Sequence, residues 1–131
     1  MSLDYSNATR HAQNEGLIAF AGSGAKFNLY TSFKPANANT PITTQTLLVS
    51  MQIAGVFGTD VDGTLTLGAV TTTQAVATGT ATFFRIFKSD GTTVVMDGTV
   101  GLSNADLILN IVDIIAAENV SISSGTLIRG N

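Results

Sequence analysis

Few side chains in this chain of 131 residues could carry protons or activate a nucleophile. Histidine occurs once, at position 11, and cysteine and tryptophan do not occur. A Ser-His-Asp arrangement would have to use His11, which stands in a polar segment with no sign of the burial or the orienting partner that a general base needs. The sequence therefore predicts a solvated or interface histidine, and no disulfide framework or thiol chemistry.

The run Asp60-Val61-Asp62-Gly63 matches the start of a calcium-binding loop. The full pattern needs further oxygen ligands at fixed offsets and a glutamate at the twelfth position. Thr64 stands at the fifth position, and no glutamate follows. We therefore favour a turn between two strands, with weak cation binding as the alternative, and we expect no metal or cofactor.

The other carboxylates and glycines give no catalytic signature. Asp90-Gly91 and Asp97-Gly98 are turn formers rather than paired catalytic acids. Glu15 and Glu118 are the two glutamates, far apart in sequence, so no feature points to a glycosidase pair. Gly22-Ser23-Gly24 follows a predicted helix, whereas a phosphate cradle precedes one. We expect a protein that is not an enzyme.

Arg85 is the charged residue with the most unusual surroundings. It lies in the most apolar segment of the chain, between Phe83-Phe84 and Ile86-Phe87. Strand alternation places it on the same face as Phe83 and Phe87. Two interpretations stay open. Arg85 could anchor an interface, or its stem could lie over phenylalanine rings with its head paired to an aspartate.

Charge is scarce in the whole chain. Only 11% of the residues are charged, against about 25% in ordinary soluble domains. The net charge of −3 argues against a nucleic-acid surface. The long uncharged stretches 35–59 and 63–84 are interrupted by Thr, Gln, Asn and Gly, so neither predicts a membrane span. A surface with so little charge favours a protein that packs against copies of itself or a partner.

The elements that must position these side chains fall into two parts of a single domain. Residues 1–25 form an N-terminal arm and helix. The helix is predicted from about Ser6 to Ala21, with Asn7 as a possible cap and Gly22-Ser23-Gly24 as its end. Residues 26–131 form the β domain, because the apolar period changes to two at Lys26.

The β domain is predicted as a series of short strands. Phe27, Leu29 and Phe33 are predicted on one face of the first strand, and Lys34–Pro41 is a loop. Ser89-Asp90-Gly91 joins two strands as a β-hairpin, and Asp97-Gly98 marks the next break. The spacing predicts an all-β fold with one N-terminal helix, as an antiparallel β-sandwich or a barrel, and we favour the sandwich. The other strands are expected at Thr46–Ile53, Thr64–Val70, Thr80–Lys88, Thr92–Met96, Asp106–Val112 and Asn119–Ile128.

Several of these runs also carry a family resemblance. FFRIFKSDGTTVVMDGTVG at 83–101, ADLILN at 105–110 and VSISSGTLI at 120–128 follow KFNLYTSFKPANANTPITTQTLLVSMQI at 26–53. This order resembles a widespread family of small structural proteins of tailed bacteriophages. The resemblance implies a jelly-roll-like sandwich and a virion component on the capsid surface, made in the host cytoplasm. Gly125-Thr126 departs from the family, which tends to carry a larger apolar residue there.

The resemblance implies a capsid decoration or cement protein. Such a protein would clamp adjacent subunits of the major capsid protein and stabilise the head, as a dimer or trimer with many weak contacts repeated by symmetry. The candidate contacts are Tyr5, Arg10 and His11 in the N-terminal segment, Lys34 and Pro35 in the Lys34–Pro41 loop, and Arg85.

Two alternatives belong to other classes. A tail or head-fibre module could recognise a host glycan, as jelly rolls commonly do. Tyr5 and Tyr30 are the only tyrosines and tryptophan is absent, which disfavours it. A small hydrolase is the third interpretation and has the least support.

Overall fold

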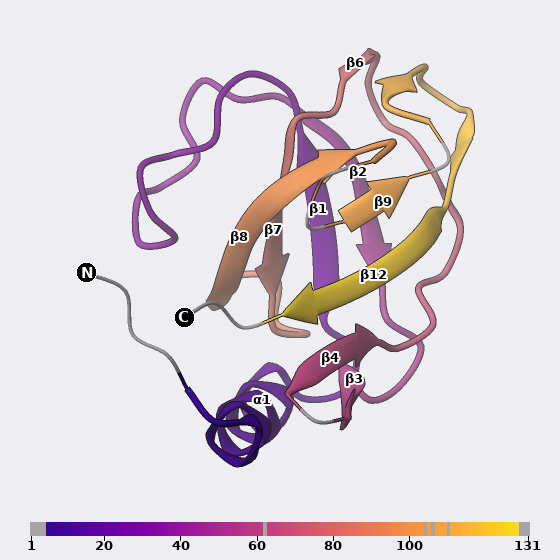
Figure 1. Cartoon of the computed structure of the whole chain (residues 1–131). Helices are drawn as coiled ribbons and strands as arrows, with labels where there is room; N and C mark the ends of the chain where they lie inside the picture. Colours follow the sequence, from indigo (N-terminus) through magenta and orange to yellow (C-terminus); the bar gives the residue numbers. More distant parts are fainter. Residues whose placement is uncertain (1–4, 62, 104, 106, 110, 129–131) are drawn as a thin grey trace.

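The computed structural model describes residues 5–61, 63–103, 105, 107–109 and 111–128, with side chains up to residue 121. In these residues the chain is mostly β, with one N-terminal helix and a curled sheet (Figure 1). The elements are α1 (Asn7–Ala21), β1 (Lys26–Tyr30), β2 (Leu47–Gln52), β3 (Gly58–Val61), β4 (Thr64–Leu67), β5 (Thr73–Gln74), β6 (Gly79–Thr80), β7 (Phe83–Phe87), β8 (Val94–Gly101), β9 (Leu107–Leu109), β10 (Asp113–Ile114), β11 (Asn119–Val120) and β12 (Ile122–Ile128).

Helix α1 begins and ends close to its predicted limits. Ser6 has an extended backbone, and its hydroxyl accepts a hydrogen bond from the Thr9 N–H at 3.1 Å, so Ser6 is the N-cap rather than Asn7. The helix ends at Gly22, as predicted, where φ is 70° and the N–H donates to the Ile18 carbonyl. Among the described residues, no helix is long and apolar enough to cross a membrane.

Within the described residues, eight strands form the curled sheet, in the order β2-β1-β7-β8-β9-β12-β4-β3. Its neighbours run antiparallel, except that β8 and β9 are parallel. The expectation of a wholly antiparallel sheet is therefore wrong, because alternation indicates which face a residue takes and not the direction of its neighbour. The short pairs β6–β10 and β5–β11 lie beyond one end of the sheet (Figure 1). The jelly-roll-like sandwich stays a prediction.

The predicted hairpin is confirmed as β7 and β8. The Asp90 carboxylate accepts hydrogen bonds from the N–H groups of Thr92 and Thr93 at 2.8 and 2.9 Å, and Gly91 has a φ of 75°. These local bonds shape the turn. The predicted break at Asp97-Gly98 is wrong, because β8 continues to Gly101 and Asp97 pairs with a residue of β7.

Other strand limits differ from the prediction. Strand β1 ends at Tyr30, and Ser32 has a φ of 73°. Phe33 therefore leaves the sheet and is 76% exposed, instead of sharing the strand face of the buried Phe27 and Leu29. Strand β4 ends at Leu67 instead of Val70. Strand β9 is described as Leu107–Leu109, and the predicted ends Asp106 and Asn110 lie outside the described residues. The predicted last strand is divided into β11 and β12.

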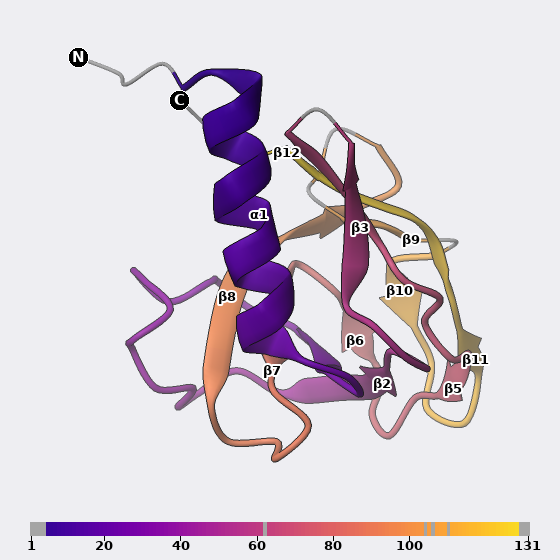
Figure 2. The same cartoon turned by 90° about the horizontal axis from the view of Figure 1, so that it is seen from below.

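The core fills the inside of the curl. Phe27 is fully buried between Phe57 and Phe84, with ring centroids 6.2 and 5.9 Å away. Helix α1 packs against β3 and β4, below the sheet in the view of Figure 1 and across the front in Figure 2. Further core residues are Leu29, Leu48, Val49, Met51, Ile53, Leu65, Ile86, Leu107, Leu109, Ile114 and Val120.

Candidate functional site

A network of polar side chains holds α1 to the β3–β4 hairpin. Its centre is the side chain of Asp60, which is fully buried. One carboxylate oxygen lies 2.5 Å from His11 Nδ1 and 3.3 Å from the Gly63 N–H, and the other accepts from Asn14 Nδ2 at 2.5 Å. Asn14 also donates to the Gly63 carbonyl at 3.0 Å. The network thus satisfies a buried carboxylate with three donors from two elements.

Electrostatics keep Asp60 charged. Burial pushes its pKa up, but the hydrogen bonds from Asn14, His11 and Gly63 outweigh burial, so the pKa of Asp60 lies below its ordinary value of 3.8. An ionised carboxylate can only accept, so the His11 Nδ1 donates and its Nε2 points to the other side. The expectation that nothing orients His11 is therefore wrong: Asp60 orients it.

The two ring nitrogens of His11 face carboxylates, those of Asp60 and Glu15, and not a serine. Its ring is half exposed, and its Nε2 lies 4.0 Å from the Glu15 carboxylate. A serine activated by His11 would need that same nitrogen. No group of three or more potential metal ligands occurs in the described part of the chain. Both oxygens of Asp60 accept hydrogen bonds from N–H donors, so neither faces a site for the weakly bound cation considered above. Asp62, the second acid of that hypothesis, lies outside the described residues.

Tyr5 and Arg10 join His11 at the start of α1. Arg10 Nε donates to the Tyr5 carbonyl at 3.1 Å. The Arg10 stem lies against Gly63, where a Cβ would come within 2.8 Å of Arg10 Cβ. A shallow hollow of about 520 Å³ beside them is lined by Asn7, Ala8, His11, Asp60 and Val61. Of the three predicted contact residues of the N-terminal segment, Tyr5 and Arg10 are joined by a hydrogen bond and only His11 lines the hollow.

Arg85 is buried and paired. Its Nε and Nη2 donate to the two oxygens of Asp97 at 2.6 and 2.9 Å, and the two side chains are 2% and 4% exposed. The bond to Asp97 outweighs burial and raises the pKa of Arg85. Of the two interpretations left open, pairing of the head with an aspartate is the one found. Arg85 therefore does not present its charge on the surface of the single chain.

Arg85 also holds the loop that contains Lys34 and Pro35. Its Nη2 donates to the Asn37 carbonyl at 3.3 Å. Lys34 is exposed and donates to the carbonyl of Pro35, whose ring is buried. An open hollow of about 530 Å³ separates the loop from the hairpin and is lined by Tyr30, Ala38, Asn39, Pro41, Ile42, Arg85, Phe87, Thr92 and Val94. Lys34, Pro35 and Arg85 thus belong to a second site, which lies between the Lys34–Pro41 loop and β7 and is separate from the network at Asp60.

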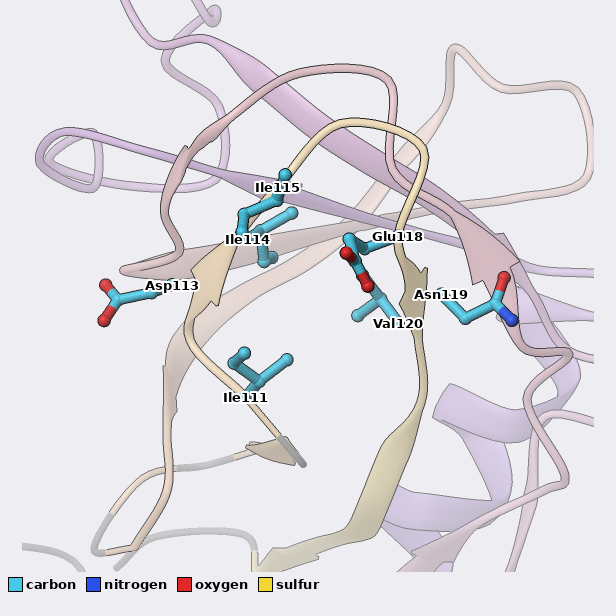
Figure 3. Close-up of a pocket in the computed structure, with 7 residues that line it drawn as sticks. All are labelled: Ile111, Asp113, Ile114, Ile115, Glu118, Asn119 and Val120. Atoms are coloured by element: carbon cyan, nitrogen blue, oxygen red, sulfur yellow. The ribbon is translucent and has the colours of Figure 1, made fainter.

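A third candidate site, a pocket, was not predicted from the sequence. A pocket of about 390 Å³ lies between β10 and β11 (Figure 3). Ile114 and Val120 are buried at its floor, and Ile111 and Ile115 are exposed at its rim. The Glu118 carboxylate points into the space between the strands. Asp113 and Asn119 also line the pocket, but their side-chain ends point away from it.

Exposed apolar side chains are spread over several elements. Besides Ile111 and Ile115, they occur on the helix, on the loops and on β3. Single exposed apolar residues are normal, but they matter more on a surface that has so little charge. They are Phe20, Phe33, Val56, Val61, Val76 and Leu102.

Comparison of the chain with protein-family models, with curated protein sequences and with solved structures gives no significant match.

Proposed function

We propose that this chain is a virion structural protein, a capsid decoration or cement protein that clamps adjacent subunits of a major capsid protein. A jelly-roll-like sandwich, a position on the capsid surface and self-association as a dimer or trimer belong to the same proposal. The resemblance of residues 26–53 and 83–128 to small structural proteins of tailed phages supports it.

The observation that carries the proposal is the character of the surface. Large apolar side chains are exposed on different elements, while only 11% of the residues of the chain are charged. Such a surface loses little by being desolvated, because few charges must leave water. It suits a protein that lies on a large repeating partner, where many weak contacts add up through multivalency.

The predicted contact residues divide into direct and supporting roles in this proposal. Tyr5, Arg10 and His11 stand at the start of α1, where they can meet a neighbouring subunit. Lys34 is exposed on its loop and can do the same. Arg85 is buried and has a supporting role: it donates a hydrogen bond to the Asn37 carbonyl and so fixes the loop that carries Lys34.

The test compares capsids of the source phage with and without the protein. Bound protein is expected to raise the temperature at which the shells release DNA, and electron cryomicroscopy should find hundreds of copies at positions between capsomers. Phe33→Ser and Lys34→Glu, which change exposed positions, should weaken binding while the fold is kept. Equal thermal release from both kinds of capsid would overturn the proposal.

A glycan-binding role on a tail or head fibre is the second candidate. The hollow between the Lys34–Pro41 loop and the hairpin favours it, because Tyr30 and Phe87 line it together with Asn39, Arg85 and Thr92. Aromatic faces with planar polar groups are typical of sugar sites. A glycan array with reproducible hits that Thr92→Ala and Asn39→Ala abolish would favour this role over decoration.

A further inference from the structure

The pocket between β10 and β11 carries one exposed carboxylate, that of Glu118, which faces the space between the strands (Figure 3). No ion pair or side-chain hydrogen bond joins the Glu118 carboxylate to another described residue. The carboxylate stands above an apolar floor of Ile114 and Val120, with exposed Ile111 and Ile115 at the rim. A ligand that matches this pocket has an apolar stem and a positively charged end.

The opposite end of the molecule presents that combination. Lys88 Nζ lies 4.6 Å from the centre of the Phe20 ring, and this ring is 50% exposed at the end of α1. Lys26 Nζ stands beside Gly91 in the adjoining turn. Among the described residues, neither lysine has a carboxylate within ion-pair distance. We name Phe20, Lys26 and Lys88 the basic corner.

The two sites do not lie side by side on one chain. In both views the end of α1 and the β7–β8 turn are at one side of the molecule, and β10 and β11 are at the other (Figures 1 and 2). A chain therefore cannot fill its own pocket with its own basic corner. A second copy can.

We propose that copies of this chain associate head to tail, with the basic corner of one copy in the Glu118 pocket of the next. Lys88 supplies the charge for Glu118, and Phe20 packs on the rim isoleucines. The contact is heterologous, so it closes into a ring or continues as an open chain, according to the rotation between neighbours. The inference deepens the self-association in the proposed function and does not depend on capsid binding, because it is measured on the isolated protein.

The test uses charge reversal on each side of the contact. Analytical ultracentrifugation of the wild-type chain from micromolar to millimolar concentration should show weak association that salt reduces. Lys88→Glu and Glu118→Lys should each weaken it by about tenfold or more, because like charges then meet. An equal mixture of the two variants should associate again, because each contact between unlike variants joins opposite charges.

Matched controls separate this contact from a general charge effect. Glu118→Gln and Asp113→Asn remove the same charge, but the Asp113 side chain points away from the pocket (Figure 3). Only Glu118→Gln should weaken association, and circular dichroism should show that both variants fold. Equal weakening by both variants would contradict the proposal.

NMR identifies the surfaces directly. Concentration-dependent shifts are expected at Phe20 and Lys88 and at Ile115 and Glu118, in the same titration. A strictly monomeric chain at millimolar concentration, or shifts at the pocket alone, would overturn the proposal. A lysine- and phenylalanine-containing peptide that shifts the pocket while the chain stays monomeric would also overturn it, and would assign the pocket to a different protein.

Discussion

Arg85 on β7 and Asp97 on β8 occupy opposite positions in the antiparallel ladder and form a two-point ion pair inside the protein. The pair orders more than the hairpin, because Arg85 also donates to the Asn37 carbonyl of the loop above it. A buried charge pair is tolerated as a pair, whereas loss of one partner leaves the other charge buried and unpaired.

Removing Asp97 alone should therefore be costly. Asp97→Ala leaves the Arg85 guanidinium at 2% exposure without its counter-ion. The expected loss is about 3–5 kcal/mol in the free energy of unfolding. Urea denaturation followed by circular dichroism measures it.

The double variant Arg85→Met/Asp97→Leu is the control for this pair. It removes both charges and keeps apolar volume, so its loss should be clearly smaller than that of Asp97→Ala. Hydrogen exchange at Ala38 and Asn39 should speed up in both variants, because the bond to the Asn37 carbonyl weakens or is lost. A double variant as unstable as the single one would contradict this account.

Asp60 should make stability depend on pH in the acidic range. Its pKa in the folded protein lies below the ordinary value of 3.8, so folding favours the ionised form. The stabilisation is complete above the ordinary value and is lost as the pH falls through the lower, folded value. Denaturant unfolding of the wild type and of Asp60→Asn, from neutral pH downward, measures the difference.

The gap between the two proteins should be largest near neutral pH and shrink below pH 3.8. Glu15→Gln, which changes an exposed acid outside the bonds to Asp60, is the matched control and should leave the gap in place. A gap that stays constant through the acidic range would count against the role of Asp60.

The sequence was sufficient for features that local chemistry decides. The turn at Ser89-Asp90-Gly91 and the helix end at Gly22 were predicted because short polar side chains and glycine act on their own backbone neighbours. The face of Arg85 was also predicted, but its partner was not. The pattern Asp97-Gly98 indicates a turn, and an unbroken register counted from the hairpin turn places Met96 opposite Arg85. The register shift between Ile86 and Phe87, which the sequence does not mark, brings Asp97 there instead.

Features that join distant segments could not be predicted. Asp60 and His11 are 49 residues apart, and no periodicity links a helix residue to a particular hairpin. The pocket at Glu118 was missed because Ile111–Ile115 has no clean alternation that separates buried from exposed residues. Phe33 continued the apolar pattern of its strand, yet the positive φ of Ser32 turns it outward.

Phe27 should be the most sensitive position of the aromatic core. It is fully buried between Phe57 and Phe84, so Phe27→Ala leaves a cavity with walls on two sides. The expected loss is about 3–5 kcal/mol in the free energy of unfolding. Phe33→Ala removes the same ring from an exposed loop and should change stability by less than about 0.5 kcal/mol. Similar losses for both variants would show that the inside of the curl is not the core.

A side chain at Gly63 should destabilise the protein, because Gly63 lies where α1 meets the β3–β4 hairpin. Its φ is +87°, and a Cβ would lie 2.8 Å from Arg10 Cβ. Gly63→Ala should therefore cost about 2 kcal/mol, from the left-handed backbone and from displacement of the helix. The NMR signals of His11 should move as well, since Gly63 belongs to the same network as Asp60.

Gly16→Ala is the matched control: a Cβ there meets nothing within 4 Å, and alanine should stabilise the helix by about 0.5–1 kcal/mol. Opposite signs for the two substitutions in the same denaturation assay are the expected result, and a neutral Gly63→Ala would mean that α1 is not held tightly against the hairpin.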